Sequence, residues 1–416
     1  MKILHVTPHL GGGVGKAHAA LGGALPTGIH RTFALLEAPR DRSHLETIEA
    51  GGARIIVAPG LDGLAALADA ADIVQFEFWN HPLLFECLAQ CRFPAMRSVF
   101  WSHISGLERP VIQPGLIEQS GRFVFSTEAS RASRTLTSLP GPAVEKIQVI
   151  NSGFGFSDPM RQPAKRERTP AIAYLGTVDF VKMHPGFFEA IDRLAGDIRV
   201  PVWGKPTAEV VARAGAMVHP ERIQFGGHAT VPAAALSGAG IFFYPLQRGH
   251  YGTAENALIE AMSLGLAPVV LDNPAELAIV RHGETGFVAS SIGHCAALLQ
   301  MLLASPDLRH KVSENARRHV AEFRTLQRSA REFVDLWQTL LAASGSKSDF
   351  RRVIGATPAE WFLATQCLPG ERWDASIHTA TGSPAKGTLA HFAATFPGDR
   401  SLARLLTASR KTSARG

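Results

Sequence analysis

The stretch Gly249-His-Tyr-Gly-Thr-Ala-Glu-Asn-Ala-Leu-Ile-Glu-Ala-Met-Ser-Leu-Gly-Leu-Ala-Pro-Val-Val270 decides the fold. It begins in a polar loop after the apolar run Ile241–Tyr244, and its apolar spacing predicts a helix over 254–264. A Gly-x-x-Pro turn at Gly265 leads into a second apolar run, so strand, helix and strand follow one another as in a βαβ unit. Ligands bind beyond the carboxyl ends of such strands. The stretch therefore predicts an α/β domain with a ligand-binding loop before the helix.

The same alternation of strands and helices occurs on both sides of a stretch rich in proline and charge, 158–170. Runs that are apolar on both faces are typical of strands in a covered parallel sheet. Before that stretch we expect strands at 3–7, 54–58, 72–78, 97–103, 122–126 and 146–151. After it we expect strands at 171–175, 199–203, 222–225, 240–245 and 267–271, followed by a last long helix over 306–343.

The predicted fold class is α/β, with two Rossmann-like doubly wound domains that face a cleft. The first domain is expected over 1–158, and an interdomain linker over 159–170. The second domain is expected over 171–343, and its last helix could return to the first domain. A basic, partly ordered extension is expected over 344–416.

Composition places the chain among globular proteins, since 46% of its 416 residues are hydrophobic and 19% are charged. Four cysteines are too few for a disulfide framework and lack zinc-like spacing, so neither disulfides nor a metal site is expected. The net charge is +6, of which +5 falls after residue 344, where ten Lys and Arg stand against five Asp and Glu. A nearly neutral body argues against nucleic-acid binding, and the basic tail favours an anionic partner such as a membrane surface.

The chain opens directly on a β-like run, Met1–Thr7, without the apolar core of a signal peptide. Its longest apolar runs are far shorter than the ~18–20 residues that span a bilayer. We therefore expect a cytoplasmic protein whose contact with a membrane, through the basic tail, is peripheral.

A glycine-rich loop, Gly11-Gly12-Gly13-Val14-Gly15-Lys16, joins the first expected strand to the first expected helix. Glycines there let the backbone approach a ligand, and a helix N-terminus attracts an anion. The string resembles the deviant Walker loop of partition-type ATPases, but a Walker loop needs a glycine at Leu10 and a hydroxyl at Ala17. The loop also does not match the Gly-x-Gly-x-x-Gly spacing of a dinucleotide-binding fingerprint. Three interpretations stay open: contact with a diphosphate or sugar, a tight turn that packs the helix on the strand, and an ATPase loop.

Several motifs taken together resemble the family 4 glycosyltransferases, retaining enzymes of the GT-B fold, over residues 1 to about 343. The matching segments are the Gly12-Gly13 pair, the strand-end His103 in Phe100-Trp-Ser-His-Ile-Ser-Gly106, Gly176-Thr177 with Lys182, Phe225-Gly-Gly-His228, and the helix that carries Glu255 and Glu260. Two positions depart from the family pattern. Thr177 stands where the family has the arginine of its Arg/Lys diphosphate-binding pair. Gly252 stands where the first acid of Glu-x7-Glu is expected, and Glu255 follows three residues later.

The resemblance implies a hexosyltransferase-type enzyme that moves a sugar from a UDP- or GDP-sugar to a hydroxyl acceptor, with retention and without metal or cofactor. The acceptor would be a glycan, a lipid-linked molecule or a small molecule. The implied roles are diphosphate binding by Gly12, Gly13, Lys182, Asn256 and the Thr177 position, base contact by His228, ribose binding by Glu260, and donor-sugar contact by His103 and Glu255.

Three further residues, Trp79, Asn80 and His81, directly follow a strand end and are candidates for acceptor contact. The departures at Thr177 and Gly252 leave a second interpretation open, a non-catalytic GT-B protein that binds a nucleotide or sugar. The P-loop ATPase is a lesser third one. The three interpretations predict different activities. The glycosyltransferase transfers sugar, the non-catalytic protein binds a nucleotide without turnover, and the ATPase hydrolyses ATP.

Overall fold

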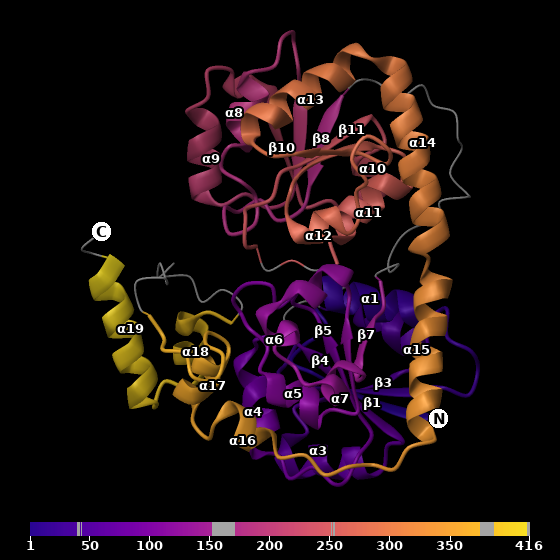
Figure 1. The fold of residues 1–416 in the computed structure, drawn as a ribbon, viewed down its shortest axis with the longest axis vertical. Coiled ribbons are helices and arrows are strands. Elements are labelled where there is room, and N and C mark those ends of the chain that lie inside the picture. Colours follow the sequence, from indigo (N-terminus) through magenta and orange to yellow (C-terminus); the bar gives the residue numbers. More distant parts are fainter. Residues whose placement is uncertain are drawn as a thin grey trace. The chain divides into compact units, whose positions relative to one another are not determined.

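The computed structural model describes residues 1–39, 42, 44–151, 171–250, 252, 254–374 and 387–413. These residues form two compact units, which are described separately below (Figure 1). Unit 1 comprises Met1–Ser126, Ser130–Ile150 and Ala330–Gly416, and unit 2 comprises Thr127–Ala129 and Asn151–Ser329. The linker expected at 159–170 lies outside the described residues.

Unit 1 is built on a seven-stranded sheet in the order β3-β2-β1-β4-β5-β6-β7. All neighbouring strands run parallel. The chain order reverses between β1 and β4, and such a switch point is where doubly wound sheets bind ligands. The strands are β1 (Lys2–Thr7), β2 (His30–Leu35), β3 (Arg54–Val57), β4 (Ile73–Phe78), β5 (Ser98–Ser102), β6 (Arg122–Phe125) and β7 (Ile147–Val149).

Helices connect these strands and cover the sheet (Figure 1). They are α1 (Gly12–Gly22), α2 (Leu45–Ala50), α3 (Gly60–Asp69), α4 (Pro82–Gln90), α5 (Pro114–Gln119), α6 (Arg134–Thr137) and α7 (Gly141–Val144). The sequence did not predict β2, because its pattern begins with two basic residues. Arg31 is nevertheless buried: its guanidinium donates to the carbonyl of His18 and lies over the Phe33 ring. These contacts satisfy a charge that would otherwise exclude the strand from a sheet interior.

The C-terminal part of the chain packs into unit 1. Its helices are α16 (Phe350–Ile354), α17 (Pro358–Ala364), α18 (Leu389–Thr395) and α19 (Arg400–Ser413). Phe350, Trp361, Phe362 and Phe392 are fully buried in the hydrophobic cluster that also contains the sheet of unit 1. This cluster explains why a polar, threonine-rich segment carries so many aromatic residues: they complete the core beside α4 and α5.

Unit 2 has a six-stranded parallel sheet in the order β10-β9-β8-β11-β12-β13, which reverses between β8 and β11. The strands are β8 (Ile172–Leu175), β9 (Val200–Trp203), β10 (Ile223–Gly227), β11 (Ile241–Tyr244), β12 (Ala267–Leu271) and β13 (Phe287–Ala289). The helices are α8 (Phe187–Asp192), α9 (Ala208–Gly215), α10 (Pro232–Ala235), α11 (Asn256–Ser263), α12 (Pro274–Leu277), α13 (Ile292–Ala304) and α14 (Pro306–Phe323).

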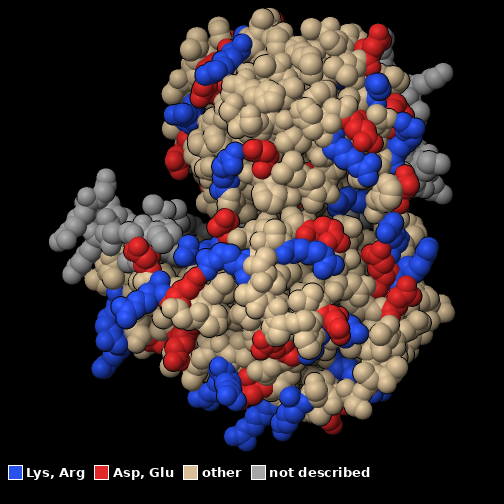
Figure 2. Space-filling view, in the orientation of Figure 1, with Lys and Arg blue, Asp and Glu red and all other residues tan. Residues whose placement is uncertain are grey.

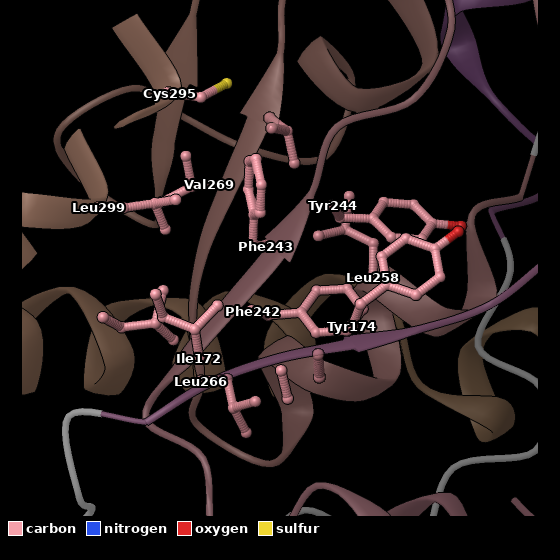
Figure 3. Packing of buried hydrophobic residues seen from close by; sticks show 14 of the residues in the cluster. Ile172, Tyr174, Phe242, Phe243, Tyr244, Leu258, Leu266, Val269, Cys295 and Leu299 are labelled. Atoms are coloured by element: carbon pink, nitrogen blue, oxygen red, sulfur yellow. The ribbon is translucent and has the colours of Figure 1, made fainter. Parts of the chain in front are cut away.

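The core of unit 2 is continuous across its central strands, as Figure 3 shows for residues of β8, β11 and β12 with the helices above and below. The rings of Tyr174 and Tyr244 stack with centroids 5.6 Å apart and their hydroxyls lie side by side. Two wholly buried tyrosines need polar partners at their hydroxyls. Those partners lead directly to the candidate site.

The long helix expected over 306–343 is two helices, α14 and α15 (Leu326–Leu341). The interruption falls at Arg324, whose side chain is buried and donates to the carbonyl of Ala278. Its backbone leaves the helical region there, with φ −133° and ψ 51°. No helix within the described ranges combines the length and the apolarity needed to cross a bilayer.

Candidate functional site

The switch point of unit 2 brings together two loops that the sequence motifs had marked. The loop after β8 carries Lys182, and the loop after β11 leads to α11 through Glu255. Glu255 precedes the first turn of α11 in a left-handed conformation, with φ 41° and ψ 49°. This backbone is unfavourable for a residue with a Cβ and persists only where the side chain is strongly held. The geometry therefore indicates that the carboxylate of Glu255 has firm partners.

Glu255 forms a buried ion pair with Lys182. The Nζ of Lys182 lies 2.9 Å from Oε2, and the hydroxyl of Tyr244 donates to the same oxygen over 2.9 Å. Burial alone would raise the pKa of Glu255, but the charge of Lys182, with help from His250, holds it below its ordinary value. The Glu255 side chain is 0% exposed, whereas that of Lys182 is 15% exposed. Part of the Lys182 side chain is thus open to solvent, and the carboxylate behind it is not.

Gly252 leaves the space that this carboxylate occupies. A Cβ at position 252 would collide with Oε1 of Glu255 and lie 3.1 Å from its Cδ. The carboxylate of Glu255 therefore lies where a side chain at position 252 would be. The acid expected at Gly252 from the motif is missing from the sequence, and Glu255 brings a carboxylate into that place from three residues further along the chain.

A second buried carboxylate, Glu276, belongs to the same cluster. His250 Nε2 lies 3.0 Å from Glu276 Oε1, and His250 Nδ1 accepts a hydrogen bond from the amide of Gly252. Burial and the neighbouring charge of Glu255 raise the pKa of Glu276, although His250 opposes them. Glu276 thus belongs to a polar layer that supports the loop before α11.

The other donor-side residues lie around this cluster in unit 2. Asn256 is the first residue of α11, and Glu260, 8% exposed, lies one turn further on. Thr177 and His228 are exposed, the first after β8 and the second after β10. All four follow the carboxyl ends of strands, and their roles as ligand contacts stay predictions.

The glycine loop of unit 1 separates into two parts with different surroundings. Gly12 and Gly13 are exposed at the start of α1, and a Cβ at either would meet no atom within 4 Å. A Cβ at Gly15 would instead collide with the carbonyl group of Leu10. Gly15 therefore serves the packing of helix on strand, whereas the space at Gly12 and Gly13 is open to solvent.

This difference predicts unequal effects of adding one methyl group. Gly15→Ala should lower the free energy of unfolding of unit 1 by about 1–3 kcal/mol, because the Leu10 carbonyl has to move. Gly13→Ala should stay within about 1 kcal/mol of the unmodified protein, since alanine favours a helix. Urea unfolding followed by circular dichroism compares the two. Equal stabilities would contradict the contact between Gly15 and Leu10.

His103 follows β5 and is held by a buried carboxylate, Glu77, on β4. The Nε2 of His103 lies 2.8 Å from Glu77 Oε2, and the backbone N–H of His103 donates to the carbonyl of Phe78. The ring of His103 lies beside those of Trp79 and Trp101, at centroid distances of 5.8 and 4.7 Å. Its side chain is 15% exposed. The residue is thus held one strand away from the switch point of unit 1, with part of its side chain open to solvent.

The three candidates for acceptor contact are largely engaged by the chain itself. Trp79 is 6% exposed, and the Asn80 amide donates to the carbonyl of Gly387. His81 caps α4 by accepting from the amide of Leu83, and its ring contacts that of His391 at 4.9 Å. The C-terminal segment therefore borders the region in which acceptor contact was expected, and that role stays a prediction.

Two groups of side chains have the composition of a metal site, namely His5, His18 and Glu77, and His9, Glu37 and His81. In the second group, the Nδ1 atoms of both histidines accept backbone N–H bonds. A neutral imidazole has one bare nitrogen, which is already used here, so neither ring is set up to bind a metal.

In the first group, Nε2 of His5 and both ring nitrogens of His18 are buried without a hydrogen-bond partner. Histidines that bind a metal usually donate their other N–H to an acceptor. The hydrogen bond of His5 and the 3.0 Å contact of His18 with Glu77 therefore account for this group better than a metal does.

Comparison with known proteins agrees with this geometry. Residues 157–319 match the family Glycosyl transferases group 1. The matched residues all lie in unit 2. Lys182, Glu255 and Glu260 all lie within the matched residues. No curated protein matches the sequence significantly.

Solved glycosyltransferase structures share the fold. Anabaena HepE, in complex with UDP and glucose, has a TM-score of 0.65 and 12% identity, over 82% of this chain and 100% of its own. A glycosyltransferase from Rickettsia africae has a TM-score of 0.65 and 14% identity, over 82% and 98%. Sucrose-phosphate synthase from Thermosynechococcus elongatus has 0.59 and 15%, over 82% and 100%. The predicted GT-B class, with two Rossmann-like domains, is confirmed.

Sequence reasoning did not identify Glu77, which holds His103, or the polar residues around Glu255, namely Tyr244, His250 and Glu276. A signal was present for Glu77, because an acid in the mostly apolar run Ile73–Phe78, where the other polar residue is Gln75, is rarely buried without partners. The others become visible only once the fold brings β11, the following loop and α12 together. Periodicity marks such positions as core or loop and gives no information on their polar partners.

Proposed function

We propose that the protein is a retaining glycosyltransferase of the family 4 type, which transfers a hexose from a nucleoside diphosphate sugar to a hydroxyl acceptor without metal or cofactor. The observation that carries the proposal is the Lys182–Glu255 pair at the switch point of unit 2, within the residues that match the group 1 family. A reachable lysine backed by a buried carboxylate suits the binding of an anionic leaving group.

Lys182 is the residue proposed to neutralise the diphosphate. The developing negative charge of the leaving group needs a fixed cation, and Lys182 cannot move freely because Glu255 and the ring of Tyr244 hold it. Glu255 therefore acts on the ligand through Lys182 and is a positioning residue, since its own carboxylate is wholly buried. Glu260 is proposed to bind the ribose hydroxyls. Asn256 and the exposed Thr177 are proposed to lie next to the phosphates of the donor.

Retention and metal independence rest on the chemistry of the side chains. The proposed reaction takes place on one face of the sugar, and a phosphate oxygen of the leaving group takes the proton of the acceptor hydroxyl. Such a reaction needs charge stabilisation and no enzyme nucleophile. Within the described residues, the two groups with metal-ligand composition are better explained by hydrogen bonding, as argued above.

A donor panel tests the proposal. Purified protein is incubated with UDP-glucose and a series of other UDP- and GDP-sugars, and release of the nucleotide is measured with and without EDTA. We expect slow hydrolysis of one class of donor that EDTA does not change, and an α-configured product by NMR from an α-linked donor. Nucleotide binding by calorimetry without release from any donor would instead support the non-catalytic alternative.

The basic tail is proposed to give peripheral contact with an anionic membrane. On the face shown in Figure 2, Lys and Arg side chains are interspersed with Asp and Glu. Attraction to an anionic membrane therefore has to come from a local group of basic residues and not from the whole face. Arg400 and Arg404 are exposed on α19. Co-sedimentation with phosphatidylserine vesicles should exceed that with phosphatidylcholine vesicles, fall with salt, and weaken in Arg400→Glu/Arg404→Glu. Equal sedimentation with both lipids would contradict it.

A further inference from the structure

The carboxylate of Glu77 is surrounded by polar side chains from β1, α1 and β4 and by His103, which follows β5. His5 Nδ1 from β1, His18 Nε2 from α1 and the side-chain amide of Gln75 on β4 all lie within 3.0 Å of its Oε1. Its Oε2 contacts His103 Nε2 over 2.8 Å. Glu77, His5 and His18 are 0% exposed. The proposed reaction has not used this buried polar cluster.

The orientation of the cluster is determined by its outer members. The indole N–H of Trp337 donates to Oε1 of Gln75, so the amide group of Gln75 must turn its NH2 towards Glu77. Burial lowers the pKa of His5 to about 3, and burial likewise lowers the pKa of His18. Both rings are therefore neutral, and the Nδ1–H of His5 is donated to Glu77 Oε1, as is an N–H of the Gln75 amide. Two donors thus occupy one oxygen of Glu77, and the other oxygen is left to His103.

This arrangement determines which nitrogen of His103 faces outward. A carboxylate accepts hydrogen bonds, so Nε2 of His103 must carry a proton. In the neutral ring the bare nitrogen is then Nδ1, for which the described residues provide no hydrogen bond, at the edge of a side chain 15% exposed. A bare Nδ1 accepts a hydrogen bond from a hydroxyl.

We propose that Glu77 is a positioning residue for His103, which fixes the Nε2–H tautomer and so presents Nδ1 as the acceptor for a hydroxyl of the bound sugar. The inference rests on the proposed function for the identity of the ligand. The tautomer itself is a property of the ligand-free protein. The two can therefore be tested apart.

Glu77→Gln gives a sharp test because it should favour the other tautomer of His103, with the ring proton on Nδ1. The two donors at Oε1, His5 Nδ1 and the Gln75 amide, require the amide oxygen of the new glutamine at that position, which places its NH2 against His103 Nε2. Nε2 must then accept, and the ring proton moves to Nδ1. Glu77→Asp retains an acceptor and should keep the Nε2–H tautomer. Glu46→Gln, an exposed acid on α2, is the matched control.

Two measurements decide the proposal. Ring ¹⁵N–¹H NMR of the ligand-free protein, with His103 assigned through His103→Gln, should show Nε2–H in the unmodified protein, Glu77→Asp and Glu46→Gln, and Nδ1–H in Glu77→Gln. With UDP-glucose, or the donor found active in the panel, kcat should fall on the order of tenfold to a hundredfold in Glu77→Gln. KM should change much less, and Glu46→Gln should behave as the unmodified protein.

A double variant separates positioning from a general structural role. If Glu77 acts through His103, Glu77→Gln should add little to the loss already caused by His103→Gln. An Nε2–H ring in Glu77→Gln, or losses that multiply in the double variant, would overturn the inference. Absence of turnover in the unmodified protein with every donor would count against the proposed function, and the NMR result would still decide the tautomer.

Discussion

Glu255→Gln is expected to lower kcat/KM by about 100-fold and the free energy of unfolding of unit 2 by about 3 kcal/mol. The amide has the size of the acid, but it removes the charge that pairs with Lys182 at 2.9 Å. The lysine is mostly buried, so it loses stabilisation and its fixed position together. Steady-state kinetics and urea unfolding measure the two effects.

The control for this prediction is Glu189→Gln. Glu189 pairs with Arg193 on the same unit, but both side chains are about half exposed. An exposed pair contributes roughly 0–1 kcal/mol, so both stability and turnover should stay near their original values. A Glu255→Gln protein with turnover within about threefold of the original would contradict the positioning role.

The pH dependence of the Glu255 effect follows from the direction of its pKa. Lys182 and His250 outweigh burial and hold the pKa of Glu255 below its ordinary value of 4.5. The pair therefore contributes its full stability above that value and loses it as the pH falls through the folded-state pKa. The stability difference between the unmodified protein and Glu255→Gln should be constant near neutral pH and shrink below about pH 4.

The fold was predictable because its signals are local. Two runs of covered parallel strands, and the loop, helix and turn of Gly249–Val270, follow from apolar spacing and turn residues alone. The strands that were missed are β2, which begins with two basic residues, and β13, which has only three residues. In both cases the pairing with a neighbouring strand, which is non-local, outweighs the weak local pattern.

The candidate site was predictable only at positions where a motif places a residue after a strand end. His103 directly follows β5, Lys182 lies in the loop after β8, and Glu255 and Glu260 lie at the start of α11, the helix after β11. The motif could not show that Glu255 points back into the protein, because that depends on a left-handed backbone and on the absence of a side chain at Gly252. Nor could it show that Glu77 holds His103. Hydrogen bonds between different strands leave no spacing in the sequence.

The relation between Gly252 and Glu255 leads to the second large effect. A glutamate at position 252 would place its carboxyl carbon two bonds, about 2.5 Å, from its Cβ, and Glu255 Cδ lies 3.1 Å from that Cβ position. The two carboxylates would therefore compete for one buried space beside Lys182. Two like charges cannot both be ionised there, so Gly252→Glu alone should lower kcat/KM at least as much as Glu255→Gln, about 100-fold or more.

Adding Glu255→Gly to Gly252→Glu should recover much of that loss. It removes the competing carboxylate and also relieves the left-handed backbone, because glycine adopts φ 41° without strain. His250 Nδ1, 2.8 Å from the Cβ position, has to shift, so recovery within about tenfold is expected rather than full activity. Kinetics of the two single variants and the double variant provide the test. If the double variant is no better than Gly252→Glu, the carboxylates do not share a place, and the role of Glu255 depends on its own position in the chain.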